Sequence, residues 1–221
     1  MIERALLRVD AKAEGLAVAV GGWCPHHDAR GNIVIGKSRW FSLSLTEATA
    51  PWAFVRGTPA RAISTLELLA ATIGLVVLTP DELSEPGAAG TVMVTGFTDS
   101  FVSSSVASRG LTTSFPLCVV AMELAAQLEH RSAELFLEWS PRTMNQESDA
   151  LADGRTNGFN PALRVPVGLS RMQWLVLDRL MAAGVPFQKQ AQMLKEQGSC
   201  TQARVTVRRA KTQRLRTRVP W

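Results

Sequence analysis

The first part of the chain alternates short hydrophobic blocks with polar turns, a pattern typical of strands. Blocks at 5–10 and 16–20 are followed by a third that covers 33–35 and 39–45. Turn-forming residues separate the blocks, including a stretch with Pro and Gly at 25–31. Because the connections are short, the three blocks predict an antiparallel meander.

The next part combines helical periodicity with single alternating strands. Its elements in chain order are a helix at 63–78, a strand at 91–95, short helical material at 100–109, a helix at 116–130, a strand at 133–139 and a helix start at 145–152. Pro116 suits a first helical position, where its missing N–H is not needed. The element order βββαβαβα predicts an α/β fold with five strands flanked by helices.

The composition changes after this part, and a second region begins. The connector at 154–166 is rich in Gly, Asn and Pro. We therefore expect one domain over 1–154 and a basic, partly helical C-terminal extension over 155–221.

Amphipathic periodicity in the extension predicts a helix that Ser170 caps and Gly184 ends. Its apolar face carries Trp174, Leu177 and Met181. A second short helix is expected at 188–197.

Charge is distributed unevenly along the chain. Thirteen basic and two acidic residues follow position 154, a net charge of +11, whereas residues 1–154 carry −6 within the chain total of +5. This distribution is typical of a metal-using module joined to an arm that binds a polyanion. A solvated tail is the competing interpretation for the last ten residues. The arm residues expected to bind nucleic acid are Arg204, Arg208, Arg209, Lys211, Arg214 and Arg216.

Hydrophobic composition and cysteine usage bear on location. The longest apolar run, 68–78, is well short of the ~20 residues that a membrane-spanning helix needs, so no membrane partner is expected. The N-terminus lacks a signal-peptide core, and the three cysteines are widely spaced. We expect an intracellular protein, in the cytoplasm or nucleus, with reduced thiols.

Four acidic residues stand at predicted strand or helix edges, in the order Asp10, Glu67, Asp99 and Asp149. Carboxylates inside apolar segments are costly to bury, and carboxylates that converge repel one another. A divalent cation removes both penalties, and Mg²⁺ prefers oxygen ligands of this kind. The joint order therefore predicts a metal site.

Each acid taken alone also has an ordinary structural explanation. Glu67 suits the exposed side of an amphipathic helix, Asp99 suits an N-cap, and Asp149 suits the first turn of a helix. Asp153, one turn after Asp149, competes for the same role. Asp10 has the weakest ordinary explanation, because it closes an apolar strand.

The segments around these acids resemble the ribonuclease H domain of retroelement reverse transcriptases. The matching segments are Val9-Asp10-Ala11, Val20-Gly21-Gly22-Trp23, Leu66-Glu67-Leu68-Leu69-Ala70, Thr98-Asp99-Ser100, and Trp139-Ser140-Pro141 leading to Asn145 and Asp149-Ala150-Leu151. The resemblance covers about residues 5–154. It implies a ribonuclease H-like mixed five-stranded sheet.

The resemblance also implies a metal-dependent endonuclease that hydrolyses the RNA strand of an RNA–DNA hybrid. Asp10, Glu67, Asp99 and Asp149 would hold two Mg²⁺ ions, with Mn²⁺ as a substitute. Asp10 would be the ligand that bridges the ions. The hybrid would be recognised through backbone shape and 2′-hydroxyl contacts. A further implied partner is the polymerase part of a larger polyprotein.

Departures from the family pattern keep other functions open. The stretch 142–144 (Arg-Thr-Met) occupies the loop where many relatives carry a histidine, and an insertion is required at 46–59. The main alternative is a catalytically inactive ribonuclease H-fold module that binds nucleic acid or connects domains. A proofreading exonuclease is disfavoured because Asp-x-Glu is missing at Asp10. A transposase or integrase is disfavoured because its last acid is a glutamate.

Other noticeable residues have simpler interpretations. The stretch 24–28 (Cys-Pro-His-His-Asp) lacks a second ligand pair at zinc-site spacing, so a surface turn is expected. Trp23, Trp40 and Trp139 are expected to fill the core rather than to stack on bases.

Overall fold

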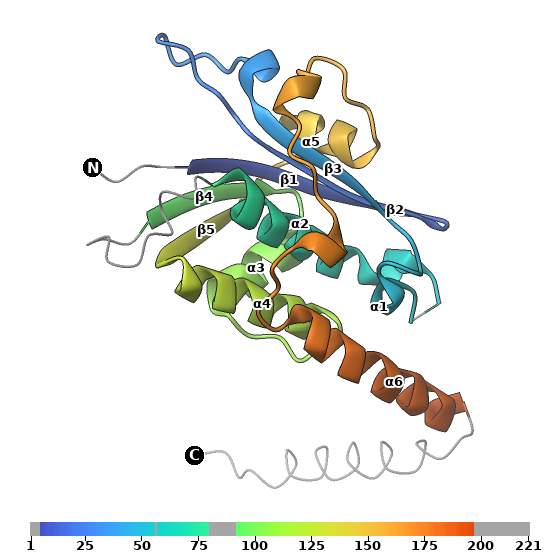
Figure 1. Cartoon of the computed structure of the whole chain (residues 1–221). Coiled ribbons are helices and arrows are strands. Elements are labelled where there is room, and N and C mark those ends of the chain that lie inside the picture. Colours follow the sequence, from blue (N-terminus) through green and yellow to red (C-terminus); the bar gives the residue numbers. More distant parts are fainter. Residues whose placement is uncertain (1–4, 56, 80–91, 197–221) are drawn as a thin grey trace, which may run out of the picture.

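A mixed five-stranded sheet forms the centre of the molecule (Figure 1). The computed structural model describes residues 5–55, 57–79 and 92–196. The strands are β1 (Ala5–Glu14), β2 (Ala17–Cys24), β3 (Arg39–Leu45), β4 (Val92–Thr98) and β5 (Ala133–Trp139). Their order across the sheet is β3-β2-β1-β4-β5.

Strand directions divide the sheet into two parts. β1, β2 and β3 are antiparallel neighbours, as their short connections predicted. β4 runs parallel to β1, and β5 runs parallel to β4, so these strands need crossover connections, which helices supply. The element order and the mixed sheet confirm the predicted ribonuclease H-like α/β fold.

Helices connect the strands and continue after the last one. They are α1 (Pro51–Phe54), α2 (Ile63–Leu78), α3 (Phe101–Arg109), α4 (Leu117–His130), α5 (Gln146–Ala152) and α6 (Leu177–Glu196). Short 3₁₀ helices include η1 (Ile35–Lys37), η2 (Pro59–Ala62) and η4 (Arg142–Met144). The insertion expected at 46–59 contains α1.

The segment between β2 and β3 is a loop instead of the strand predicted at 33–35. Asp28 Oδ1 accepts hydrogen bonds from the backbone N–H groups of Arg30 and Asn32, which closes a tight turn. Ile33 forms an isolated bridge with His27, and the chain then enters η1. The prediction is wrong because local hydrogen bonds to an aspartate outweigh the β propensity of a short apolar run.

Consecutive glycines in β2 face opposite sides of the sheet, and each is tightly packed. A Cβ on Gly21 would lie 2.6 Å from Ala152 N and 2.8 Å from Leu151 Cβ, both in α5. A Cβ on Gly22 would lie 2.9 Å from Val9 Cγ1, on the side against which α2 packs. Because neighbouring strand residues point to opposite faces, α5 covers one face and α2 covers the other.

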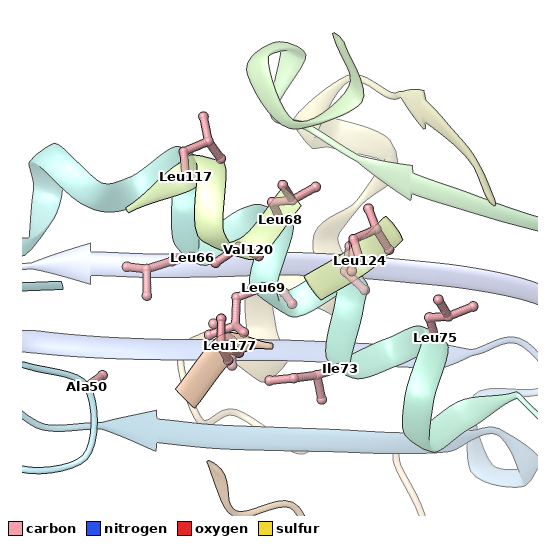
Figure 2. Close-up of a cluster of buried hydrophobic side chains, with 14 of the residues drawn as sticks. Ala50, Leu66, Leu68, Leu69, Ile73, Leu75, Leu117, Val120, Leu124 and Leu177 are labelled. Carbon is pink, nitrogen blue, oxygen red and sulfur yellow. The ribbon is translucent and has the colours of Figure 1, made fainter. Parts of the chain in front are cut away.

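Helix α2 lies at the centre of the hydrophobic core (Figure 2). Its completely buried side chains include Leu66, Leu68, Leu69, Ile73 and Leu75. Burial of this kind contributes about 1.5–3 kcal/mol for each large apolar side chain. The stretch Pro59–Leu78 is long and apolar enough to cross a membrane by length and composition, but 72% of it is buried inside the domain, as in a core helix.

A smaller hydrophobic cluster on the α5 face joins residues after position 154 to the sheet. Its buried members are Trp23, Trp40, Leu151 and Phe159. Trp40 Nε1 donates a hydrogen bond to the Asn160 carbonyl at 2.9 Å. The predicted burial of Trp23 and Trp40 is confirmed, whereas Trp139 is 52% exposed and the prediction for it is wrong.

A buried acid of α4, Glu123, fixes the start of α6. Its carboxylate accepts hydrogen bonds from the backbone N–H groups of Leu175, Val176 and Leu177 at 3.0, 2.7 and 2.8 Å. These are N–H groups that a helix start leaves without intrahelical partners. The contact attaches α6 to the domain, and Leu177 and Met181 join the main core.

The helix predicted between Ser170 and Gly184 is wrong at both ends. It begins later, because Glu123 supplies its cap, and it runs through Gly184 instead of stopping there. A Cβ on Gly184 would lie 2.2 Å from Phe115 Cε2, so this glycine permits close packing. The second helix expected at 188–197 is the C-terminal part of α6.

Candidate metal centre

Asp10 lies where the sheet opens between β1 and β4. On one side Asp10 pairs with Gly21 of β2. On the other side, the pairing of β1 with β4 ends at Arg8 and Phe97, so no described strand pairs with Asp10 there. Asp10 is 4% exposed, and its Oδ1 accepts a hydrogen bond from Ala11 N at 2.8 Å. The opening leaves room for acids from neighbouring elements.

Glu67 and Asp99 reach this opening from two other elements. Glu67 lies in the second turn of α2 and is 5% exposed, and Thr98 Oγ1 donates a hydrogen bond to its Oε2 at 3.1 Å. Asp99 directly follows β4 and is half-buried. One oxygen atom from each of Asp10, Glu67 and Asp99 lies within 4.8 Å of the other two. We call these residues the three-acid cluster.

The ordinary explanations for Glu67 and Asp99 do not hold. Glu67 is buried instead of lying on an exposed helix face. The N-cap of α3 is Ser100, whose side chain accepts a hydrogen bond from Ser103 N, so Asp99 is free of that role. Trp139 Nε1 donates to the backbone carbonyl of Asp99 at 3.0 Å, which fixes the turn that carries this acid.

Convergence and burial raise the pKa values of two of these acids. Burial is the main cause that raises the pKa of Asp10 to about 7, and the charge of Asp99 adds to it. Burial likewise raises the pKa of Glu67 to about 9, with the charges of Asp10 and Asp99 as further causes. Without a cation, the three-acid cluster therefore retains protons near neutral pH. Perturbation of this size in a cavity is typical of functional sites.

The three-acid cluster fits a hard divalent cation. Two oxygens bound to one Mg²⁺ at ~2.1 Å lie at most ~4.2 Å apart. The cluster meets this limit after a contraction of at most about 0.6 Å, which small side-chain rotations can supply. A donor set made of carboxylates is the kind that Mg²⁺ and Mn²⁺ prefer. A cation would also reduce the repulsion that raises the two pKa values.

Asp149 lines the same cavity but does not belong to the three-acid cluster. The cavity has a volume of about 640 Å³, and its other walls include Arg142 and Asp153. Asn145, just before α5, anchors this helix to the sheet, because its Nδ2 donates to the Val9 carbonyl at 2.9 Å. The fourth predicted acid is therefore held beside the cluster by a buried amide.

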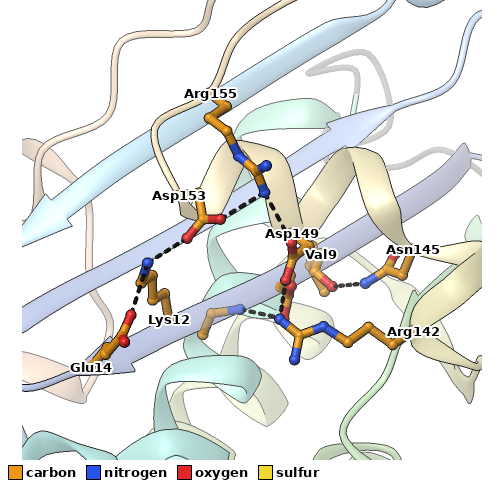
Figure 3. Close-up of polar contacts among 10 residues, drawn as sticks. Val9, Lys12, Glu14, Arg142, Asn145, Asp149, Asp153 and Arg155 are labelled. Carbon is orange, nitrogen blue, oxygen red and sulfur yellow. Dashed lines mark hydrogen bonds and ion pairs between the residues drawn. The ribbon is translucent and has the colours of Figure 1, made fainter.

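Two arginines hold the Asp149 carboxylate (Figure 3). Arg142 Nη2 donates to Oδ1, and Arg155 Nη2 donates to Oδ2 at 3.2 Å. Arg155 also donates to Asp153 Oδ2 at 2.7 Å, and Asp153 Oδ1 accepts from Lys12 Nζ at 2.6 Å. We call these five residues the ion-pair row. Its charges alternate, and four of its members, Lys12, Arg142, Asp149 and Asp153, line the cavity.

The ion-pair row contains site residues that the sequence reasoning missed. The sequence marks Arg142 only as the residue in place of a loop histidine, and Arg155 only as one basic residue among many. Their separations of seven and six positions from Asp149 are the available signal, but the pairing depends on η4 and α5 folding beside β1. The arm residues at 204–216 that are expected to bind nucleic acid lie outside the described residues.

Known proteins resemble this chain in fold and little in sequence. No family model and no curated protein matches it. Ribonuclease H1 of the archaeon Halobacterium salinarum is 18% identical, with 69% of this chain and 97% of that chain covered and a TM-score of 0.45. LC11-RNase H1, isolated from compost and solved in complex with an RNA/DNA hybrid, is 16% identical over 68% of this chain and 94% of that chain, with a TM-score of 0.47. Prototype foamy virus protease–reverse transcriptase is 18% identical over 69% of this chain and 21% of that chain, with a TM-score of 0.36. These likenesses concern the fold and carry no information about activity.

Proposed function

We propose that the chain is a metal-dependent endonuclease of the ribonuclease H type, which hydrolyses the RNA strand of an RNA–DNA hybrid. The observation that carries the proposal is the three-acid cluster, in which Asp10, Glu67 and Asp99 converge within 4.8 Å at an open cavity. Three separate elements supply these acids, and two of the acids, Asp10 and Glu67, are almost completely buried. A purely structural role would not require such repulsion.

The three-acid cluster is costly for the metal-free protein. Two buried carboxyl groups with raised pKa values reduce folding stability at neutral pH, because the unfolded chain ionises them freely. Binding of Mg²⁺ or Mn²⁺ offsets this cost, since a cation stabilises the ionised form of each ligand. The buried acids thus lower the folding stability of the metal-free protein and provide affinity for a divalent cation.

The neighbouring residues prepare the site for that cation. Hydrogen bonds from Ala11 N and Thr98 Oγ1 fix Asp10 and Glu67 in the folded protein, so little reorganisation accompanies binding. A bound divalent cation would lower the pKa of a water molecule for attack at phosphorus and would neutralise charge on the phosphate. The expected products carry 5′-phosphate and 3′-hydroxyl ends.

Recognition of the hybrid would rest on its backbone. The cavity is open, and Arg142 is 74% exposed at its wall, where it can contact a phosphate oxygen. The basic extension, with a net charge of +11, supplies a second contact that does not depend on sequence. The sequence resemblance is the ground for proposing a retroelement origin and a polymerase part as partner.

A second candidate is a catalytically inactive module that keeps the fold and binds nucleic acid. The observation that favours it is the ion-pair row, because both oxygens of Asp149 are engaged by arginines. An inactive module would retain hybrid binding through its basic residues without needing a cation.

The deciding experiment is cleavage of a labelled RNA–DNA hybrid by the full chain with Mg²⁺ or Mn²⁺. The native protein, Asp10→Asn and Glu129→Gln are compared, the last as a control that removes an exposed carboxylate from α4. Metal-dependent cutting of the RNA strand that only Asp10→Asn abolishes supports the endonuclease. Salt-sensitive hybrid binding without cutting, unchanged by Asp10→Asn, would replace it with the inactive module.

A further inference from the structure

We propose that the metal centre binds one divalent cation. The guanidinium groups of Arg142 and Arg155 provide positive charge where a second cation would otherwise bind. The inference rests on the proposed function, because it assumes that the three-acid cluster binds a cation. It differs from the two-ion site that the resemblance implies. The departure follows from how the Asp149 carboxylate is engaged.

Both oxygens of Asp149 already have cationic partners. Arg142 donates to one oxygen and Arg155 to the other, and the side chain of Asp149 is only 22% exposed. A carboxylate that binds a metal ion directs a lone pair at the ion, so at least one arginine contact would have to break. Charge-assisted hydrogen bonds from guanidinium groups are among the stronger ones in proteins.

Charge also separates the two halves of the cavity. The three-acid cluster has no cationic side chain within its group, and one divalent ion would neutralise most of its negative charge. Around Asp149, two guanidinium groups face one carboxylate, so this half is already neutral or positive. A second divalent ion placed here would meet two fixed positive groups at close range.

Arg155 is held in place from two directions. It contacts Asp149 and, at 2.7 Å, Asp153, which is itself paired with Lys12 at 2.6 Å. Removing Arg155 from Asp149 would therefore disturb the rest of the ion-pair row. Arg142 contacts Asp149 and is 74% exposed, against 59% for Arg155, so it is the more accessible of the two.

The pair has a use in the proposed reaction. A phosphodiester in the cavity brings negative charge that increases on its departing oxygen, and guanidinium groups stabilise such charge through paired N–H donors. Arg142, which lines the cavity, would contact the phosphate directly, and Arg155 would add positive charge beside Asp149. They would supply the positive charge that the second ion supplies in two-metal sites.

Counting bound Mn²⁺ tests the inference without measuring activity. The full chain is titrated with Mn²⁺, and bound ions are counted by calorimetry and by the loss of the free-ion electron paramagnetic resonance signal. The variants are Arg142→Gln, Arg155→Gln and their combination, with Arg109→Gln as an exposed arginine control on α3. Because Arg142 is exposed, the first variant is not expected to affect folding.

The native protein and Arg109→Gln should bind one ion, and the combined variant should bind two. Asp149→Asn should leave the affinity of the first ion within about threefold of native. Asp10→Asn should weaken it by at least about 100-fold. Two ions in the native protein would overturn the inference and leave the proposed function standing. One ion in the combined variant would overturn the role of the arginines. No bound ion in any protein would overturn the proposed function as well.

Discussion

The two halves of the cavity, the three-acid cluster and the ion-pair row, both bring carboxylates together, but their carboxylates differ in burial and in ion pairing. The three-acid cluster buries Asp10 and Glu67 without an ion pair to a basic side chain among the described residues, and their pKa values rise. The ion-pair row keeps Asp149 and Asp153 partly exposed and pairs each with basic side chains, and the pKa of Asp153 is lowered, chiefly by its hydrogen bond from Lys12.

The difference separates buried acids that have no ion-pair partner among the described residues from acids that basic side chains already pair. Unpaired buried acids are costly to ionise, and either a proton or an added cation relieves this cost. Paired surface acids are satisfied within the chain and gain little from a further cation. Acidic residue type and sequence order therefore do not distinguish these two kinds of acid, because their neighbours come from other parts of the chain.

Removing an acid from the three-acid cluster has the largest expected effect. We expect Glu67→Gln to lower hybrid cleavage by at least about 10³-fold, because a cation ligand is lost. The same change should raise the free energy of unfolding of the metal-free protein at pH 8 by about 1–4 kcal/mol, since a neutral isostere replaces a buried acid. Single-turnover cleavage and urea unfolding measure the two effects.

Glu129→Gln, on the exposed side of α4, is the control and should change neither the cleavage rate nor the free energy of unfolding. Loss of both activity and stability would mean that Glu67 is a structural residue.

The pH dependence of stability should also distinguish the two halves. The folded-state pKa values of Asp10 and Glu67 are raised to about 7 and about 9, so between pH ~4 and ~9 the folded chain binds more protons than the unfolded chain. Their contribution to stability is therefore present below pH ~4 and is lost as pH rises through the folded-state values. We expect the Tm of the metal-free protein to fall by about 5–10 °C more between pH 5 and pH 9 than that of the double variant Asp10→Asn/Glu67→Gln.

Added Mg²⁺ sharpens this pH experiment. The cation should restore most of the lost Tm at pH 9 and have little effect at pH 5, where protons compete with it for the ligands. Scanning calorimetry with and without Mg²⁺ measures both effects. A Tm difference that is independent of pH would show that the cluster does not titrate in the folded protein.

Packing at Gly21 should reveal whether the two halves need each other. A Cβ there would lie 2.6 Å from Ala152 N, so Gly21→Ala must displace α5 and with it Asp149. We expect a loss of about 1–3 kcal/mol in unfolding free energy, as for other overpacked sites. Mn²⁺ affinity of the three-acid cluster should persist. Gly36→Ala is the control, because its Cβ would meet only Gly158 O at an ordinary 3.7 Å. Equal stability of both variants would contradict the close approach of α5.

Periodicity and turn residues were enough to predict the element order and the location of three acids. Asp10 lies in β1 and Asp99 directly follows β4, both at places that the alternation pattern identifies, and parallel pairing of β1 with β4 brings these places together. Glu67 follows because α2 is apolar on all sides, so an acid in it is conspicuous. Local pattern and global fold agree for these three residues.

The rest depends on contacts that a local pattern does not contain. The cap of α6 comes from Glu123, which lies 52–54 positions before the N–H groups that it accepts. Gly184 lies inside α6 and close to Phe115, although glycine by itself favours a helix end. The engagement of Asp149 depends on where η4 places Arg142. In all three cases the local sequence permits more than one structure, and a tertiary contact determines which one forms.

A substitution at Lys12, the outer end of the ion-pair row, should have the smallest effect on stability. Lys12 pairs with Asp153 at 2.6 Å and with Glu14 at 3.2 Å, in contact with solvent. We expect Lys12→Gln to shift the Tm by less than about 2 °C at low salt and by nothing measurable in 1 M NaCl, because exposed ion pairs are weak and screened. Thermal unfolding at the two salt concentrations measures the shift, and Lys37→Gln, an exposed lysine in η1, is the control. A shift as large as that of Gly21→Ala would mean that the ion-pair row holds α5 in place. The row would then be part of the fold, and its arginines could not be exchanged for a second cation without unfolding this wall of the cavity.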